Sequence, residues 1–118
     1  MGYEYPVHVI VPTEVVEAGE DAAFHYADDR MLEWRSLQEH AFVMDDLRPV
    51  ADLLGELEDD PEKRLRVVLI PDGRKRDGNP WSGQYGQVSD DEWWVALRWL
   101  LLQYHDDCVV TGWYRCYL

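Results

Sequence analysis

The chain has 118 residues, of which 47% are hydrophobic, and a formal net charge of −13. This length and hydrophobic content fit one ordinary core, so we expect a single domain spanning residues 1–118. The strong negative charge argues against direct nucleic-acid binding, because phosphates would be repelled. The longest apolar stretch, 93–102, is about half the length needed to cross a bilayer, and the N-terminus lacks a signal-peptide pattern. We therefore expect a cytoplasmic protein without membrane contact.

Two templates compete over residues 21–38, which follow a predicted first strand at 7–11. As a helix, the segment has a continuous apolar stripe on one face. As a hairpin, it would turn at 28–30 between strands at 23–27 and 31–35. We favour the helix because its stripe is longer and the segment contains no glycine or proline. The stripe consists of Phe24, Ala27, Met31, Trp34 and Leu37.

The middle of the chain predicts a short strand in the apolar run 41–44, then a helix and a further strand. Asp45 and Asp46 open a predicted helix that extends to about Leu57, with Pro49 in or near its first turn, where a missing N–H costs least. The continuous apolar run at 65–70 predicts a central strand buried on both faces. The expected inner face of the helix consists of Leu47, Val50, Leu54 and Leu57.

The last third of the chain predicts a long loop, a hydrophobic helix and a closing strand. Residues 72–88 contain four glycines and a proline, which is typical of a loop. The S-x-x-E pattern that begins at Ser89 is a capping box and predicts a helix to about Tyr104. This helix is Trp-rich and apolar on almost all sides, so we expect it to be buried. Residues 108–118 predict a strand in which Gly112 forms a bulge or kink.

The order of these elements predicts an α+β fold, in which a mixed sheet of about four strands is packed by two to three helices. The Trp-rich buried helix lies near the C-terminus of this arrangement. Cys108 and Cys116 fall on the same predicted strand, where eight residues of extended chain would separate them by about 26 Å. We therefore expect two reduced, partly buried thiols rather than a disulfide.

No spacing in the chain requires catalysis or a metal. The five Asp–Asp pairs lack the spacing of a calcium loop and suit helix starts or solvated connections. The four histidines are scattered, without a zinc motif. His105, beside Asp106 and near Cys108, is the one place where a thiolate could be activated, although a helix end followed by a core cysteine explains it better. We expect no catalytic residues, no metal, no cofactor and no enzymatic activity.

The negative charge is concentrated in one part of the chain. Between Glu14 and Glu62 there are sixteen acidic and three basic residues, and the remainder of the chain is balanced. An enzyme that binds phosphates has a basic cleft, which an acidic surface complements. We therefore expect an acidic binding protein that inhibits or neutralises a basic partner, namely a nuclease toxin or another nucleic-acid-binding enzyme. In size and charge, though not in motif, the chain resembles immunity proteins.

The predicted contacts with this partner combine carboxylates with aromatic anchors, which dominate the binding energy of many interfaces. The loop at 72–88 contributes because it places a basic run beside two aromatic residues between glycines. The predicted contact residues are Asp28, Asp29, Glu33, Trp34, Glu39, Asp59, Asp60, Arg74, Arg76, Trp81 and Tyr85.

The sequence is also compatible with three alternative functions. A nucleic-acid mimic that blocks a defence enzyme would need carboxylates in rows at phosphate-like spacing. A small cytoplasmic enzyme or ligand binder would use the loop at 72–88 and the His105 region. An oligomeric accessory subunit would pack through the hydrophobic helix, and a homo-oligomer would then form.

Overall fold

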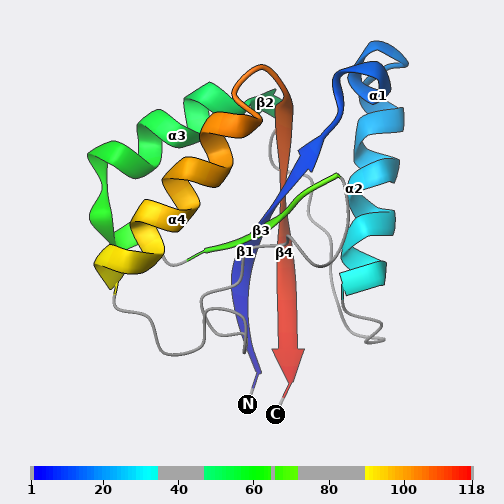
Figure 1. Cartoon of the computed structure of the whole chain (residues 1–118). Coiled ribbons are helices and arrows are strands. Elements are labelled where there is room, and N and C mark those ends of the chain that lie inside the picture. Colours follow the sequence, from blue (N-terminus) through cyan, green and yellow to red (C-terminus); the bar gives the residue numbers. More distant parts are fainter. Residues whose placement is uncertain (1, 35–46, 65, 72–89, 118) are drawn as a thin grey trace.

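The computed structural model describes residues 2–34, 47–64, 66–71 and 90–117, with side chains from Pro6 to Trp113 within these ranges. It confirms an α+β fold with a four-stranded mixed sheet and helices packed against it (Figure 1). The elements in chain order are β1 (Gly2–Val11), α1 (Thr13–Glu17), α2 (Glu20–Trp34), β2 (Leu47–Pro49), α3 (Val50–Asp59), the 3₁₀ helix η1 (Pro61–Lys63), β3 (Val67–Leu69), α4 (Asp90–Gln103) and β4 (Cys108–Tyr117).

The two long strands β1 and β4 form the centre of the sheet, whose strand order is β2-β4-β1-β3. They pair antiparallel, β2 pairs antiparallel with β4, and β3 pairs parallel with β1. The β1–β4 ladder matches residues one to one from Gly2↔Tyr117 to Val11↔Cys108 and includes Val7↔Gly112. The predicted bulge at Gly112 is therefore wrong, because a bulge needs two residues of one strand opposite one of the other.

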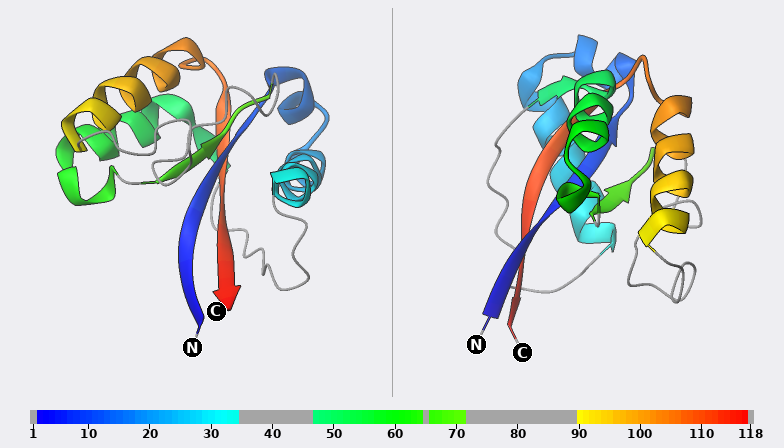
Figure 2. Two further views of the ribbon diagram at one scale, coloured as in Figure 1. Left: turned by 60° about the horizontal axis from the view of Figure 1, so that its bottom comes forward. Right: turned by 90° about the vertical axis from the view of Figure 1, so that its left-hand side faces the viewer.

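Helices cover both faces of the sheet (Figure 2). Side chains alternate along a strand, so Val7 and Val9 of β1 point to the α2 side while Ile10 points to α3 and α4. β3 is likewise buried on both faces, as predicted, with Val67 on one side and Val68 on the other. It lies at the edge of the described sheet, beside β1, so the predicted central position of this strand is wrong. The sheet thus lies between two hydrophobic clusters, one on each of its faces. A surface over one cluster is on the opposite side of the molecule from a surface over the other.

Residues 20–34 form helix α2, which confirms the predicted helix over this range and excludes the hairpin, while residues 35–38, including Leu37 of the predicted stripe, lie outside the described residues. Ala23, Ala27 and Met31 of α2 are buried against the sheet. Arg30 is also buried, with 5% of its surface exposed, and its guanidinium donates to the carbonyl oxygen of Ile70 at 2.9 Å. This hydrogen bond joins the inner face of α2 to the end of β3.

Helix α3 begins at Val50, so the predicted start at Asp45 and Asp46 is wrong. Leu47 to Pro49 instead form the edge strand β2, which pairs with β4. Pro49 lacks an N–H, so it suits both the end of an edge strand and the position before a helix. The rest of the predicted inner face is confirmed, and it also includes Leu53, so that the buried residues are Val50, Leu53, Leu54 and Leu57.

Helix α4 is buried along one side only, whereas its composition predicts burial all round. Trp93 is 1% exposed, and its indole N–H donates to the carbonyl oxygen of Arg64 at 2.7 Å. On the outer side, Val95, Trp99 and Leu102 are 68%, 64% and 43% exposed. The predicted capping residue Ser89 lies outside the described residues. The helix therefore presents an apolar strip to solvent.

Candidate functional site

The predicted partner contacts fall into two groups on opposite faces of the sheet (Figure 2). One group lies on α2 and the other at the end of α3, so no single flat surface contains both. The first group is Asp28, Asp29, Glu33 and Trp34, the second is Asp59 and Asp60, and Glu39, Arg74, Arg76, Trp81 and Tyr85 lie outside the described residues.

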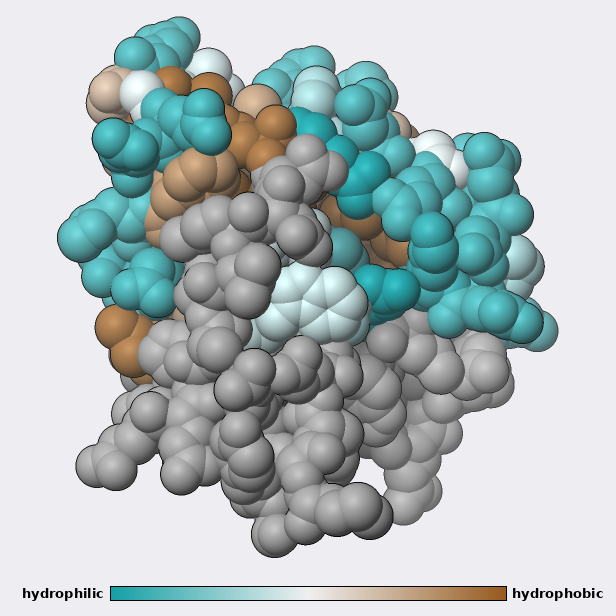
Figure 3. Space-filling model, turned by 180° about the vertical axis from the view of Figure 1, so that it is seen from behind, coloured by the Kyte–Doolittle hydropathy of each residue, from teal (hydrophilic) through white to brown (hydrophobic). Residues whose placement is uncertain are grey.

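Helices α1 and α2 together form the most acidic surface of the described chain. They contain seven acidic residues and a single Arg or Lys, namely Arg30. Arg30 is buried, and its guanidinium donates to the carbonyl oxygen of Ile70 and pairs with Glu33 at 3.2 Å, so these two helices carry no exposed Lys or Arg. In Figure 3, hydrophilic residues cover much of both helical sides of the molecule. We define the acidic face as Glu14, Glu17, Glu20, Asp21, Asp28, Asp29 and Glu33.

One apolar residue lies within the acidic face. Leu32 is 42% exposed and follows Asp28 and Asp29 by one helical turn, so the three side chains are neighbours on the helix surface. Leu32 is not among the partner contacts predicted from the sequence. Trp34 is among them, but it is half-buried and packs against the hydrophobic cluster on the α2 side of the sheet. The i, i+3 and i+4 spacing from the two aspartates is the signal that could have identified Leu32.

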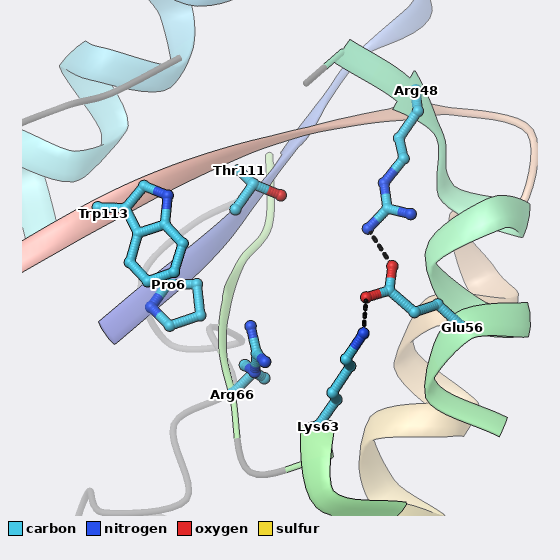
Figure 4. A pocket seen from close by; sticks show the side chains of 7 residues that line it. All are labelled: Pro6, Arg48, Glu56, Lys63, Arg66, Thr111 and Trp113. Atoms are coloured by element: carbon cyan, nitrogen blue, oxygen red, sulfur yellow. Dashed lines mark hydrogen bonds and ion pairs between the residues drawn. The ribbon is translucent and has the colours of Figure 1, made fainter. Parts of the chain in front are cut away.

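A pocket of about 300 Å³ lies on the other face of the sheet, between the strands and the end of α3 (Figure 4). Its wall joins side chains from β1, β2, α3, η1 and β4 with the residue that precedes β3. Sequence reasoning did not find it, although the basic residues at 63, 64 and 66 directly before β3 were a signal. The lining residues are Pro6, Arg48, Glu56, Lys63, Arg66, Thr111 and Trp113.

Glu56 holds two of the basic side chains at one end of the pocket (Figure 4). One carboxylate oxygen lies 2.6 Å from an Arg48 guanidinium nitrogen, and the other lies 3.1 Å from Lys63 Nζ. Burial favours a higher pKa for Glu56, but hydrogen bonds and charges from Arg48 and Lys63 outweigh it and keep the pKa below its ordinary value. Glu56 is therefore ionised at neutral pH and fixes both cations.

Arg66 is the third cation of the pocket. Within the described part of the chain, its guanidinium forms no hydrogen bond or ion pair. Burial lowers its pKa, and the charges of Glu56 and Asp60 partly oppose this effect. An arginine stays charged at neutral pH despite such a shift. The pocket thus contains a partly buried positive charge without a direct partner among the described side chains.

His8 lies beneath this site on β1 and is 3% exposed. Its Nδ1 is 2.9 Å from Oγ1 of Thr111, its cross-strand neighbour, while its Nε2 has no hydrogen-bond partner among the described residues. Burial, reinforced by the charges of Arg66 and Arg48, lowers the pKa of His8 to about 3. The ring is therefore neutral at physiological pH.

The segment around Cys108 does not form an activated thiolate. Burial and the charge of Asp107 raise the pKa of Cys108, so it carries its proton at neutral pH. His105 Nδ1 lies 3.7 Å from Asp106, and both side chains are exposed. Cys108 is free and half-buried, and β4 extends without a turn to Cys116.

The described residues contain neither a metal-binding cluster nor a membrane-spanning helix. They contain no group of three or more His, Cys, Asp or Glu side chains placed to hold a metal ion. Among the same residues, no helix has the length and apolar character required to cross a membrane.

These features define a small α+β protein with an acidic helical face on one side of its sheet and a basic pocket on the other. Comparisons with protein-family models, curated proteins and solved structures found no match.

Proposed function

We propose that the protein is a cytoplasmic binding protein that neutralises a basic protein partner through the acidic face of α1 and α2. The partner is a nuclease toxin or another enzyme that binds nucleic acid. Such an enzyme needs a basic cleft for phosphates, and the acidic face offers carboxylates that compete for the same surface.

One observation carries this proposal: α1 and α2 expose their carboxylates while their only arginine is buried. Six of the seven acidic side chains are exposed and Asp28 is half-buried. A surface with an excess of charge of one sign raises association rates with an oppositely charged protein, and salt screens the effect. Leu32 adds an apolar centre bordered by charge, which is the usual anatomy of a protein interface.

The test uses two charge-reversal variants with the same change in net charge. Asp21→Lys/Asp29→Lys alters the acidic face, whereas Asp52→Lys/Asp59→Lys alters α3 on the opposite side. Each variant replaces one exposed acid in the first turn of a helix and one exposed acid further along, so the two variants change the net charge and the first turn in the same way. Asp59 is the last residue of α3, where a lysine also suits the helix dipole. Circular dichroism establishes that both remain folded.

Basic proteins captured from a host lysate at low salt are identified by mass spectrometry, and the association rate of a captured nuclease is then measured. We expect Asp21→Lys/Asp29→Lys to slow association by about tenfold or more, since electrostatic steering contributes about 10- to 1000-fold. The α3 variant should stay within about twofold. The captured nuclease should also lose its activity at an equimolar ratio. Equal slowing by both variants, or full nuclease activity in the complex, would contradict the proposal.

The outer strip of α4 supports a second candidate function, that of a subunit in a homo-oligomer. Val95, Trp99 and Leu102 recur at helical spacing and are exposed together. Contiguous exposed apolar residues of this kind mark contact sites between proteins. We propose that this strip is the contact in that case.

A further inference from the structure

The basic pocket is lined by more basic than acidic side chains in a protein whose net charge is −13, and Asp60, which is not part of the lining, lies 3.9 Å from Lys63 Nζ. Arg48, Lys63 and Arg66 line it with a single carboxylate, Glu56. The other described Lys and Arg side chains have partners outside the pocket. Arg30 donates to the carbonyl of Ile70 and Arg98 to the carboxylate of Glu58. Arg64 donates to the carbonyls of Leu57 and Glu58. Positive charge is therefore concentrated at this site, although the whole chain is acidic.

Arg66 indicates that the site is built for an anion. Desolvating a cation is unfavourable unless a counter-charge or hydrogen bonds offset it. Glu56 lies close enough to raise the pKa of Arg66, but it bonds directly to Arg48 and Lys63. An anion in the pocket would supply Arg66 with the acceptor oxygens that the described chain does not.

The pair of His8 and Thr111 adds a hydrogen-bond donor at the pocket wall. A neutral histidine has one ring N–H, and threonine has one hydroxyl hydrogen. The single hydrogen bond between them uses one of these two hydrogens. When Nδ1 is the donor, the Thr111 hydroxyl keeps its hydrogen for an acceptor in the pocket.

The opposite end of the pocket is apolar. Pro6 and Trp113 are cross-strand neighbours on β1 and β4, and their rings lie together at this end of the site (Figure 4). An indole is a large surface for a planar organic group. The pocket therefore combines a cationic end with an aromatic end, as small-molecule sites commonly do.

We propose that this pocket binds a small phosphate monoester, with its phosphate at Arg66, Lys63 and Arg48 and its organic group against Trp113 and Pro6. Three basic side chains around one lining carboxylate suit the dianion that a monoester forms above its second pKa of about 6. Guanidinium groups suit phosphate oxygens because of their fixed fork of donors. A volume of about 300 Å³ favours a small ester over a dinucleotide.

Calorimetry of the full chain at low salt and pH 7.5 tests the ligand class with three probes: phenyl phosphate, inorganic phosphate and benzoate. We expect phenyl phosphate to bind about fivefold or more tightly than either other probe, because it alone combines a dianion with a ring. Inorganic phosphate binding equally well would overturn the ester, and benzoate binding equally well would overturn the dianion. No phenyl phosphate binding up to about 10 mM, beyond even millimolar affinity, would overturn the site.

Variants locate the binding. Arg66→Gln should weaken both phosphate probes by about tenfold or more, because a charge-assisted hydrogen bond is lost. Arg98→Gln is the matched control, since Arg98 pairs with Glu58 away from the pocket, and it should leave both affinities unchanged. Equal loss in the two variants would indicate nonspecific charge attraction and contradict the proposal.

The aromatic end is tested by Trp113→Leu, which should weaken phenyl phosphate and leave inorganic phosphate unchanged. Thermal unfolding reports whether each variant is folded. A measurement on the unaltered protein needs no variant: transferred nuclear Overhauser effects should connect the phenyl protons with the Trp113 indole. Their absence while the probe is bound would overturn this placement. None of these variants touches α1 or α2, so the pocket and the proposed inhibitory face can fail independently.

Discussion

At the scale of single residues, His8 makes the stability of the fold depend on pH. Its pKa is 6.5 in an unfolded chain and about 3 in the folded protein, because burial disfavours its charged form and Arg66 and Arg48 reinforce this effect against Glu56. Below pH 6.5 the unfolded state therefore binds the proton and the folded state does not. The stabilisation is fully present above pH 6.5 and is lost as the pH falls towards 3.

We expect His8 to contribute a fall in the free energy of unfolding of about 1.4 kcal/mol per pH unit across this window. Urea unfolding of the unaltered chain and of His8→Gln between pH 7 and pH 4.5 isolates this contribution from that of the carboxylates. The slope should be shallower in His8→Gln, whereas His25→Gln, which alters an exposed histidine on α2, should keep the full slope. Parallel curves for His8→Gln and the unaltered chain would rule this role out.

At the scale of elements, the apolar strip on α4 leads to a prediction about assembly. If Val95, Trp99 and Leu102 form a contact between copies, Trp99→Glu should place a charge in it and release monomers. Trp99 is 64% exposed, so this change should alter the free energy of unfolding by less than about 0.5 kcal/mol. Light scattering after size exclusion gives the mass. Leu32→Glu, on the opposite face, is the control and should leave the mass of the assembly unchanged. If Trp99→Glu also leaves this mass unchanged, the strip is not a contact between copies.

The elements that the sequence predicts well are those whose pattern is local. The 3.6-residue stripe identifies α2, and the run at 65–70 identifies the buried strand β3. The short strand expected at 41–44 lies outside the described residues, and the residues of β2 were assigned to a helix instead, because this edge strand is defined by pairing with β4, far along the chain. The outer side of α4 was also missed, since composition does not reveal which side of an apolar helix meets the core.

The acidic face and the basic pocket also differ in how far the sequence predicts them. The acidic face follows from composition within α1 and α2, so the sequence could predict its carboxylates. It could not predict that Arg30 turns inward, because that depends on the carbonyl of Ile70 on another element. The basic residues before β3 are a local signal of the pocket, but Arg48, Glu56 and Trp113 come from three separate elements, so no local spacing predicts that they join it.

At the scale of the whole molecule, the net charge of −13 should destabilise the compact state through self-repulsion. The Debye length falls from about 30 Å at 10 mM salt to about 8 Å at 150 mM, which screens repulsion across a molecule whose longest extent is 39 Å. We therefore expect the melting temperature in a phosphate-free buffer to rise over this range of NaCl concentration. A constant or falling melting temperature would show that the carboxylates do not repel one another appreciably.

The charge-reversal variants reveal where that repulsion lies. Asp21→Lys/Asp29→Lys and Asp52→Lys/Asp59→Lys make the net charge less negative by the same amount. If the repulsion were spread evenly over the surface, salt would therefore raise the melting temperature of both variants by the same, smaller amount. On α3, however, carboxylates already have basic partners, since Glu56 pairs with Arg48 and Lys63. The acidic face has no exposed Lys or Arg on α1 or α2. The variant of the acidic face should therefore lose more of the salt response, and an equal loss would place the repulsion across the whole surface instead.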